Sequence, residues 1–290
     1  FLLILFLLAL FIIWRINPRK YISSSSVASA YDKWTDDKLL ERLWGEHIHL
    51  GFYPSGKIIN TDFRKAKVQF VHELVKWSGL NELPKGSRIL DIGCGIGGSS
   101  RILAKYYDFN VTGITISPAQ VKRARQLTSS GLTCNFQVMD ALDLKFEDGS
   151  FDAIWSVEAG AHMNDKTKFA DEMLRILRPG GYLALADWNS RDLNKYPPSF
   201  LERMVLKQLL EQWVHPNFIS ITEFSNILFA NKNSSGSVTS ESWNTYTNPS
   251  WYDSIIEGIR RPSAILSLGP SAIVKSIREI PTILLMNWAF

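Results

Sequence analysis

A run of glycines directly after a short apolar segment most constrains what this chain can fold into. Residues 89–100 read I-L-D-I-G-C-G-I-G-G-S-S, an apolar run with one acid, then a glycine cluster and a helix-forming segment. Glycine has no Cβ and tolerates positive φ, so a loop that carries Gly93, Gly95 and Gly97 can turn tightly and lay its backbone against a ligand. The same letters fit the dinucleotide pattern G-x-G-x-x-G, which alone is a weak signal.

Asp91, two residues before the first of these glycines, separates two classes of ligand. A nicotinamide or flavin nucleotide sets its pyrophosphate at the helix N-terminus, where a neighbouring carboxylate is poorly placed. S-adenosylmethionine has no phosphate and carries two cationic groups, a sulfonium and an amino group. The acid beside the loop therefore favours S-adenosylmethionine over a dinucleotide as the cofactor.

Strand and helix patterns alternate through about a hundred residues around this loop. Ser117-Pro118 has the residue types of a helix N-cap and first position, and Arg178-Pro179-Gly180-Gly181 those of a helix stop. Alternation of this kind predicts a parallel, doubly wound sheet, that is, an α/β, Rossmann-like fold. Together with the glycine loop and Asp91, it favours the class I methyltransferase form of this fold. The expected elements after the first strand are strands over 111–116, 136–141, 151–156 and 182–187, and a helix over 168–177.

The ends of the first three strands carry the candidate cofactor residues. Asp91, Gly93, Gly95 and Gly97 are expected to hold the methionine end of S-adenosylmethionine. Folds of this kind normally end the second strand with an acid that binds the ribose, but here Thr115 stands there with a neutral hydroxyl. Asp140 follows the third strand and is placed to accept a hydrogen bond from the adenine amino group.

These motifs resemble those of a known group of enzymes. The order D-x-G-x-G-x-G-G, G-I-T-x-S-P, an acid after the third strand and L-R-P-G-G is similar to the S-adenosylmethionine-dependent methyltransferases. Three flanking segments, 31–34, 43–53 and 155–163, resemble the tocopherol-pathway C-methyltransferases. Within these they resemble the cyanobacterial type that acts on 2-methyl-6-phytylbenzoquinol, a sister group of the γ-tocopherol methyltransferases. The likeness runs from about residue 31 to the C-terminus and includes the motif W-V-H-P at 213–216.

The resemblance implies methylation of the aromatic ring of a prenylated benzoquinol, with a phytyl or solanesyl tail, in tocopherol or plastoquinone biosynthesis. It also implies that the N-terminal region folds over the cofactor, with Tyr31 near the methionine end, and that His47, His49 and Trp213 face the acceptor. Two alternative functions stay open. In the first, the acceptor is γ-tocopherol, a sterol or another lipid, because the core motifs bind the cofactor and do not determine the acceptor. In the second, the chain is a non-catalytic cofactor-binding subunit.

Two residues after the fourth strand are the candidate catalytic groups. An aromatic carbon is a poor nucleophile until a ring hydroxyl loses its proton, and a hydroquinol ionises near pH ~10, as tyrosine does. A positioned base can accelerate such a step by about a hundredfold or more. His162 and Glu158 follow the fourth strand, where the sheet edge opens towards a ligand. Spaced i, i+4, they would share a face of a helix. The alternative for His162 is a packing residue.

Composition argues against several other functions. The formal net charge of +4 and the absence of a basic face interleaved with aromatic residues speak against nucleic-acid binding. His47 and His49 alternate, but no third ligand stands at a suitable spacing, so no metal site is expected. Cys94 and Cys134 lie far apart and are expected to be reduced thiols, Cys94 as a small residue in a tight turn.

The first fourteen residues are all apolar, and Arg15, Arg19 and Lys20 follow them. A membrane span needs about 20 residues. Since the chain starts with Phe, we expect residues 1–20 to be a membrane anchor whose start is missing, with a cationic flank. A cleaved secretory signal that ends at 28–30, and a buried core helix, are the alternatives. The cations predict that the catalytic part lies on the cytoplasmic, or plastid stromal, side.

Three further regions complete the expected organisation: an N-terminal helical cap at 21–80, the cofactor-binding core at 81–190, and the lid, final strands and C-terminal helices at 191–290. The apolar stripe of 196–216 fits a helix that is either a lid over a prenyl channel or an ordinary core element. Residues 238–246 fit one arm of a final β-hairpin, with a surface turn at 231–237. The tail 265–290 either lies on the bilayer surface or completes the acceptor cavity.

Overall fold

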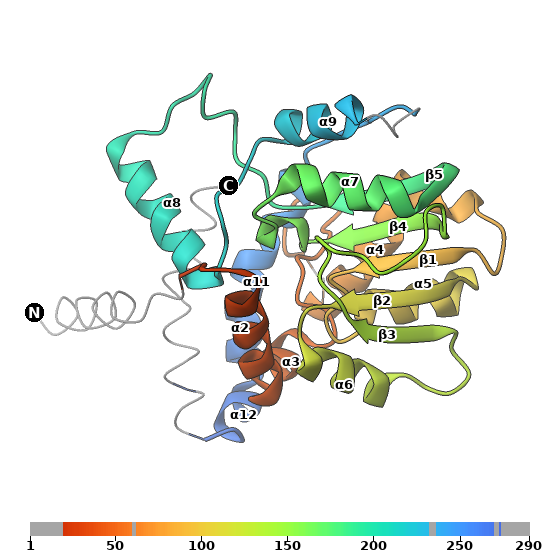
Figure 1. The fold of residues 1–290 in the computed structure, drawn as a ribbon. Coiled ribbons are helices and arrows are strands. Elements are labelled where there is room, and N and C mark those ends of the chain that lie inside the picture. Colours follow the sequence, from red (N-terminus) through yellow and green to blue (C-terminus); the bar gives the residue numbers. More distant parts are fainter. Residues whose placement is uncertain (1–19, 60–61, 232–235, 270–272, 274–290) are drawn as a thin grey trace, which may run out of the picture.

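The computed structural model describes residues 20–59, 62–231, 236–269 and 273, and its centre is a five-stranded parallel sheet (Figure 1). The strand order is β3-β2-β1-β4-β5. The strands are β1 (Arg88–Ile92), β2 (Asn110–Thr115), β3 (Cys134–Val138), β4 (Phe151–Val157) and β5 (Leu177–Ala186). Because the chain leaves β1 towards β3 on one side and later returns to β4 on the other, the sheet is doubly wound, and the predicted fold class is confirmed.

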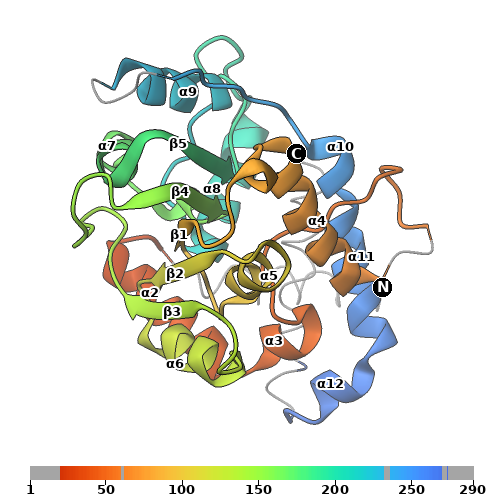
Figure 2. The same cartoon turned by 90° about the vertical axis from the view of Figure 1, so that its right-hand side faces the viewer.

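Helices cover both faces of this sheet, as Figure 2 shows. Along β1, Ile89 points to one face and Leu90 to the other, because side chains alternate along a strand. The Ile89 face packs against α4 (Phe63–Trp77) and α5 (Gly98–Tyr107). The Leu90 face packs against α7 (Lys166–Ile176) and α9 (Ile221–Ala230). Strands buried on both sides account for the nearly continuous apolar runs in the sequence.

The remaining helices lie around the carboxyl ends of the strands and beside α4. Helix α2 (Ser24–Asp36) packs against α6 (Pro118–Leu127), whose N-cap Ser117 accepts a hydrogen bond from Gln120 N, as the Ser-Pro pair predicts. Figure 1 shows α2 and α8 (Phe200–Trp213) beyond the arrowheads of the strands. The other elements are α3 (Leu39–Trp44), η1 (Leu80–Glu82), η2 (Gly160–His162), α10 (Asn244–Thr247), α11 (Pro249–Arg260) and α12 (Pro262–Leu266).

The helix stop expected at 178–181 is confirmed, because α7 ends at Ile176, directly before it. The following strand begins earlier than expected: β5 starts at Leu177, and residues 178–181 form a bulge between the pairs Leu177–Phe151 and Tyr182–Ala153. The expected strand at 238–246 is wrong. Residues 238–246 form no strand, since 237–243 have no regular structure and α10 follows. A polar segment with few β-branched residues forms a strand only where a neighbouring strand pairs with it.

The predicted anchor at 1–20 lies almost wholly outside the described residues, and so does most of the tail from residue 270 onwards. Within the described part of the chain, no helix combines the length and the apolar character that a membrane crossing requires.

Candidate active site

A pocket opens at the carboxyl ends of β1 to β4, and segments far apart in sequence form its walls. The glycine loop after β1, helix α2, residues 46–49, the turn after β4 and the end of α8 all contribute. Gly97 is the one predicted site residue that does not line it. Those that do are Tyr31, His47, His49, Asp91, Gly93, Gly95, Thr115, Asp140, Glu158, His162 and Trp213.

The glycines of the loop have two different roles. Gly93 and Gly97 have positive φ and are packed against protein: a Cβ at Gly93 would lie 2.2 Å from Ala159 Cβ, and one at Gly97 would lie 2.7 Å from Phe136 Cζ. Gly95 also has positive φ, but a Cβ there would meet only Gln120 Nε2, at 3.9 Å. Gly93 and Gly97 thus shape the loop, whereas Gly95 leaves open space at the pocket wall.

Asp91 is a buried acid with no cation beside it among the described residues. Its side chain is 2% exposed, and its Oδ2 accepts a hydrogen bond of 2.5 Å from the hydroxyl of Ser100. Burial raises the pKa of Asp91 to about 7, although the Ser100 hydrogen bond lowers it. A carboxyl group in this state gains from a cationic ligand, so Asp91 fits the charge of S-adenosylmethionine better than that of a dinucleotide phosphate.

Thr115 and Asp140 lie at the ends of β2 and β3, as the sequence predicts. The Thr115 hydroxyl donates to Gln120 Oε1 at 2.6 Å, so its hydrogen is already engaged in a hydrogen bond within the protein. Gln120, which the sequence did not single out, lines the pocket at this point. Asp140 accepts from Leu142 N at 2.9 Å through Oδ1.

Glu158 and His162 do not lie on one helix, so the shared face that their i, i+4 spacing would give in a helix is not formed. Glu158 directly follows β4 and has a φ of 55°, a left-handed conformation that costs a non-glycine residue energy and is typical of functional sites. His162 ends the short helix η2. Gly160, between them, packs closely on Asp187: a Cβ there would lie 2.3 Å from Asp187 Oδ2, so a larger residue would not fit.

The Glu158 carboxylate is tied to the segment before α4. The backbone N–H of Leu50 donates to Glu158 Oε1 at 2.9 Å. Burial raises the pKa of Glu158 to about 7, while the hydrogen bond from the Leu50 backbone lowers it. A carboxyl group with this pKa exchanges its proton near neutral pH.

His162 is hydrogen-bonded at both ring nitrogens. Its Nδ1 lies 3.3 Å from the carbonyl of Val214, which can only accept, so Nδ1 carries the hydrogen. Its Nε2 then accepts from the hydroxyl of Tyr31, at 2.9 Å. Burial lowers the pKa of His162 to about 4, so the ring is neutral at pH 7. It stacks on His215 with 4.1 Å between ring centroids.

His47 and His49 form a buried pair in the pocket wall. His49 Nδ1 donates to Leu50 O at 2.7 Å, so His49 Nε2 accepts from His47 Nδ1 at 3.1 Å. Burial lowers the pKa of His49 to about 3. Among the residues that the structure describes, no three His, Cys, Asp or Glu side chains form a group that could hold a metal ion.

Trp213 belongs to an aromatic cluster, and it is the only one of the cluster residues below that the sequence predicts as a site residue. Its ring centroid lies 5.9 Å from that of Trp34 and 6.3 Å from that of Trp188. Trp188 in turn lies 5.2 Å from His215. Both missed residues had a signal in the sequence, because Trp188 closely follows the fifth strand and His215 is part of the W-V-H-P motif.

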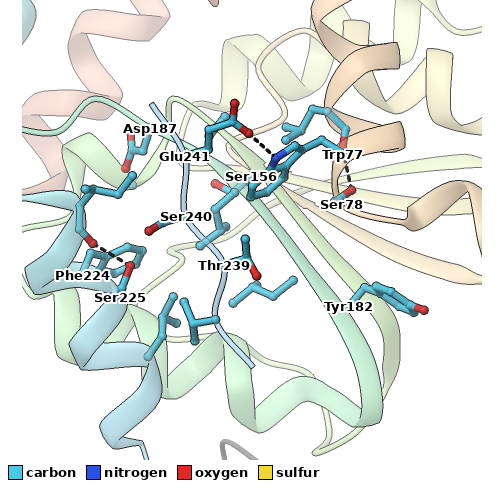
Figure 3. A pocket seen from close by; sticks show the side chains of 18 of the residues that line it. Trp77, Ser78, Ser156, Tyr182, Asp187, Phe224, Ser225, Thr239, Ser240 and Glu241 are labelled. Carbon is cyan, nitrogen blue, oxygen red and sulfur yellow. Dashed lines mark hydrogen bonds between the residues drawn. The ribbon is translucent and has the colours of Figure 1, made fainter. Parts of the chain in front are cut away.

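A second, larger cavity of about 1130 Å³ lies beside β5 (Figure 3). Residues 236–241 run along it, and the Trp77 indole donates to Glu241 Oε2 at 2.7 Å. Glu158 and Trp188 line this cavity as well as the first pocket, so the two spaces meet where β4 and β5 end.

Comparison with known sequences places the chain in a family. Residues 90–185 match the model of a methyltransferase domain. The chain is 54% identical to the 2-methyl-6-phytyl-1,4-hydroquinone methyltransferase of Synechocystis over 96% of this chain and 87% of that protein. It is 34% identical to the chloroplastic tocopherol O-methyltransferase of Arabidopsis thaliana, over 86% of this chain and 73% of that protein.

Solved structures agree with the fold. A putative sarcosine dimethylglycine methyltransferase from Galdieria sulphuraria has a TM-score of 0.71 at 23% identity, covering 89% of this chain and 94% of that one. Geranyl diphosphate C-methyltransferase from Streptomyces coelicolor, solved with S-adenosyl-L-homocysteine, has a TM-score of 0.65 at 19% identity, over 88% and 93% of the two chains. The resemblance that the motifs predict is thus confirmed, and the chain belongs to the family of S-adenosylmethionine-dependent methyltransferases that includes 2-methyl-6-phytyl-1,4-hydroquinone methyltransferase and tocopherol O-methyltransferase.

Proposed function

We propose that this chain methylates a ring carbon of a prenylated benzoquinol, 2-methyl-6-phytyl- or 2-methyl-6-solanesyl-1,4-benzoquinol, in tocopherol or plastoquinone biosynthesis. The name of the Synechocystis relative, at 54% identity, supports this acceptor class. The structural observation that carries the proposal is the position of Glu158: a carboxyl group with a pKa of about 7 lines the pocket that the glycine loop also lines.

In this proposal the glycine loop and its neighbours hold the cofactor. Bound S-adenosylmethionine supplies an electrophilic methyl group on sulfur. Gly95 leaves space for the cofactor at the pocket wall, and Asp91 gives its cationic end a counter-charge. Thr115 and the adjacent Gln120 stand beside the ribose, and Asp140 beside the adenine.

Glu158 is the group that we assign to proton removal from the acceptor. Its pKa of about 7 lies between that of an ordinary carboxylic acid and that of a hydroquinol, ~10, so about half of the molecules carry the carboxylate at pH 7, and this form can accept a proton. Loss of the hydroxyl proton makes the ring carbon nucleophilic. The proton on the methylated carbon then moves to the ring oxygen, which restores the hydroxyl and the aromatic ring, and the one proton released overall is the one that Glu158 has accepted.

His162 is better suited to positioning than to proton removal. Its accepting nitrogen already receives the hydrogen bond from Tyr31, and its pKa of about 4 makes it a weak base. We assign to Tyr31 and His162 together the orientation of the acceptor ring, and to His47, His49 and Trp213 the walls around it.

We also propose that the protein works at a membrane, with its catalytic part on the cytoplasmic or plastid stromal side. A phytyl or solanesyl tail keeps the acceptor in a bilayer, and residues 1–14 have the composition of an anchor. The start of α8 adds support, because Phe200 is 71% exposed and Leu201 is 60% exposed. Lys195 and Arg203, both exposed, flank these two residues.

The test is an assay of the full chain with methyl-labelled S-adenosylmethionine and a panel of acceptors in detergent: the two prenyl hydroquinols, their oxidised quinones, γ-tocopherol and a sterol. We expect label in the hydroquinols and little in the quinones, which have no hydroxyl proton to lose. Preferred labelling of γ-tocopherol or of the sterol would replace the proposed acceptor, and equal labelling of quinone and hydroquinol would remove the role of Glu158.

A further inference from the structure

Lys67 is a charged side chain in the middle of the fold. It lies on α4 and is 0% exposed. Its ammonium donates to the backbone carbonyls of His47, at 2.8 Å, and Trp44, at 3.2 Å. It also lies over the aromatic rings of Trp44 and Phe63, 3.9 and 4.1 Å from their centroids. These contacts fix both ends of the four residues from Trp44 to His47.

The segment that Lys67 holds leads, at one side, to the glycine loop. Glu46 forms an ion pair with Arg101 of 2.6 Å, and Arg101 Nη1 donates to the carbonyl of Ile96 in the loop at 2.8 Å. The carbonyl of Glu46 would lie 2.4 Å from a Cβ at Gly98, so the two backbones are in close contact. The segment thus packs directly against the glycine loop.

At its other side the same segment leads to the catalytic carboxylate. His47 donates to His49, His49 donates to the carbonyl of Leu50, and the N–H of Leu50 donates to Glu158 Oε1 at 2.9 Å. Residues 44–50, here called the bridging segment, therefore contact the cofactor loop and Glu158 within seven residues.

Burying the ammonium group of Lys67 costs free energy. Removing a charge from water costs several kcal/mol, and replacing buried ionic groups by apolar residues of similar volume is often neutral or stabilising. Burial accordingly lowers the pKa of Lys67 far below its usual range, with a smaller opposing effect of Glu158. Methionine would fill the same volume without this cost but would leave the Trp44 and His47 carbonyls without a donor, so what the lysine adds is a fixed position for these two carbonyls.

We propose that Lys67 is a positioning residue that fixes the bridging segment, and thereby sets the glycine loop and Glu158 in place relative to each other. The role at Glu158 rests on the proposed function, whereas the role at the glycine loop requires only cofactor binding. Among the described residues, Lys67 alone donates hydrogen bonds to both the Trp44 and the His47 carbonyls.

The test compares K67M, which keeps the volume but loses the donors, with K65M, which removes an exposed lysine of the same helix. We expect K67M to bind S-adenosylhomocysteine about tenfold more weakly in calorimetry, as the loss of hydrogen bonds from a charged donor implies, and K65M to bind it normally. K67Q keeps a neutral N–H donor, so its affinity should lie between. A K67M protein with a lower melting temperature but unchanged affinity and turnover would make Lys67 a structural residue only.

Hydrogen exchange on the unsubstituted protein tests the same proposal and does not depend on whether the variants fold. S-adenosylhomocysteine should slow the exchange of amides in 44–51 together with those in 92–98. Protection of the glycine loop without any in 44–51 would overturn the proposal. Neither measurement needs an acceptor, so a failure of the prenyl-hydroquinol assay would leave this result intact, and the reverse also holds.

Discussion

The hydroxyl of Tyr31 and Nε2 of His162 lie 2.9 Å apart, although 131 residues separate them in the chain. The carbonyl of Val214 fixes the tautomer of His162, so the tyrosine is the donor. Helix α2 is thus joined to the turn after β4 at the point where we place the acceptor ring.

Removing this hydroxyl should slow turnover more than it weakens cofactor binding. We expect Tyr31→Phe to lower kcat by about tenfold, the effect of one lost hydrogen bond, with a small change in the Kd of S-adenosylhomocysteine. Tyr21→Phe, which removes another hydroxyl from the same pocket, is the matched control and should leave kcat nearly unchanged. If Tyr31→Phe instead loses cofactor affinity tenfold and keeps a normal kcat, Tyr31 acts only in cofactor binding.

Glu158→Gln should remove the base while keeping the shape of the site. We expect kcat to fall by about a hundredfold or more. In the unsubstituted enzyme, with saturating S-adenosylmethionine, kcat/KM for the acceptor should rise with pH around a midpoint near 7, because the carboxylate is the active form and burial raises its pKa to about 7. This rise should be missing in Glu158→Gln. A rise near pH 4 that disappears in His162→Gln would instead identify His162 as the base, since its pKa is lowered to about 4.

Asp91 should make cofactor binding depend on pH. Its pKa in the free protein is about 7, and the ammonium group that S-adenosylhomocysteine shares with S-adenosylmethionine favours the carboxylate, so the affinity for S-adenosylhomocysteine should rise from pH 6 to pH 8, with proton release on binding. Calorimetry in buffers of different ionisation enthalpy measures that release. Asp91→Asn should bind more weakly and lose this part of the pH dependence, and an unaltered dependence in this variant would contradict the assignment.

The same group should affect the stability of the ligand-free protein with a definite sign. The folded protein holds the Asp91 proton more tightly than the unfolded chain does. Its contribution therefore lowers the free energy of unfolding as pH rises from about 4 to about 7, and is constant above that range. Urea denaturation at several pH values, with Asp91→Asn as the comparison, measures this contribution.

Two glycines of the loop should respond differently to one added methyl group. Both have positive φ, so alanine costs each about 1 kcal/mol in backbone strain. At Gly93 the new Cβ would also collide with Ala159, at 2.2 Å, so Gly93→Ala should lower the melting temperature strongly. At Gly95 it would meet only Gln120 Nε2 at 3.9 Å, so Gly95→Ala should stay folded but lose cofactor affinity. Normal binding in a folded Gly95→Ala would show that the cofactor does not approach this position.

The membrane proposal predicts that a chain that starts at Lys20 becomes at least partly soluble and still methylates a detergent-dispersed acceptor. The cut must not go further, because Tyr21 and Ser24 line the pocket. Fractionation and an activity assay on the same preparation check both parts. A soluble, folded and inactive protein would mean that the removed segment helps to form the site.

The sequence predicts best those parts of the site that depend on local pattern. The glycine loop, Asp91 before it, the Ser-Pro start of α6 and the acid after β3 all follow from residue types at fixed short spacings. The ends of parallel strands meet at one edge of a sheet, so such residues come together once the fold class is known.

What the sequence did not predict depends on contacts between distant segments. Lys67 looks like any surface lysine of an amphipathic helix, and only packing shows that α4 turns it inward. Residues 178–181 follow the end of α7, as the sequence predicts, but only the pairing of β4 with Leu177 and Tyr182 shows that they are a bulge inside β5. The i, i+4 spacing of Glu158 and His162 suggested a shared helix face, but the positive φ of Glu158, which no local rule indicates, breaks that geometry.

The enclosed position of Glu158 also bears on how the product leaves. In the proposed reaction the carboxylate gains a proton while the pocket loses the positive charge of the sulfonium, so the pocket has the same net charge before and after methyl transfer. Neither state leaves an unpaired charge in a medium of low dielectric constant, where such a charge costs several kcal/mol. Methyl transfer therefore creates no new electrostatic attraction between the pocket and the two products, S-adenosylhomocysteine and the methylated ring. Proton transfer from Glu158 to solvent then restores the carboxylate for the next cycle.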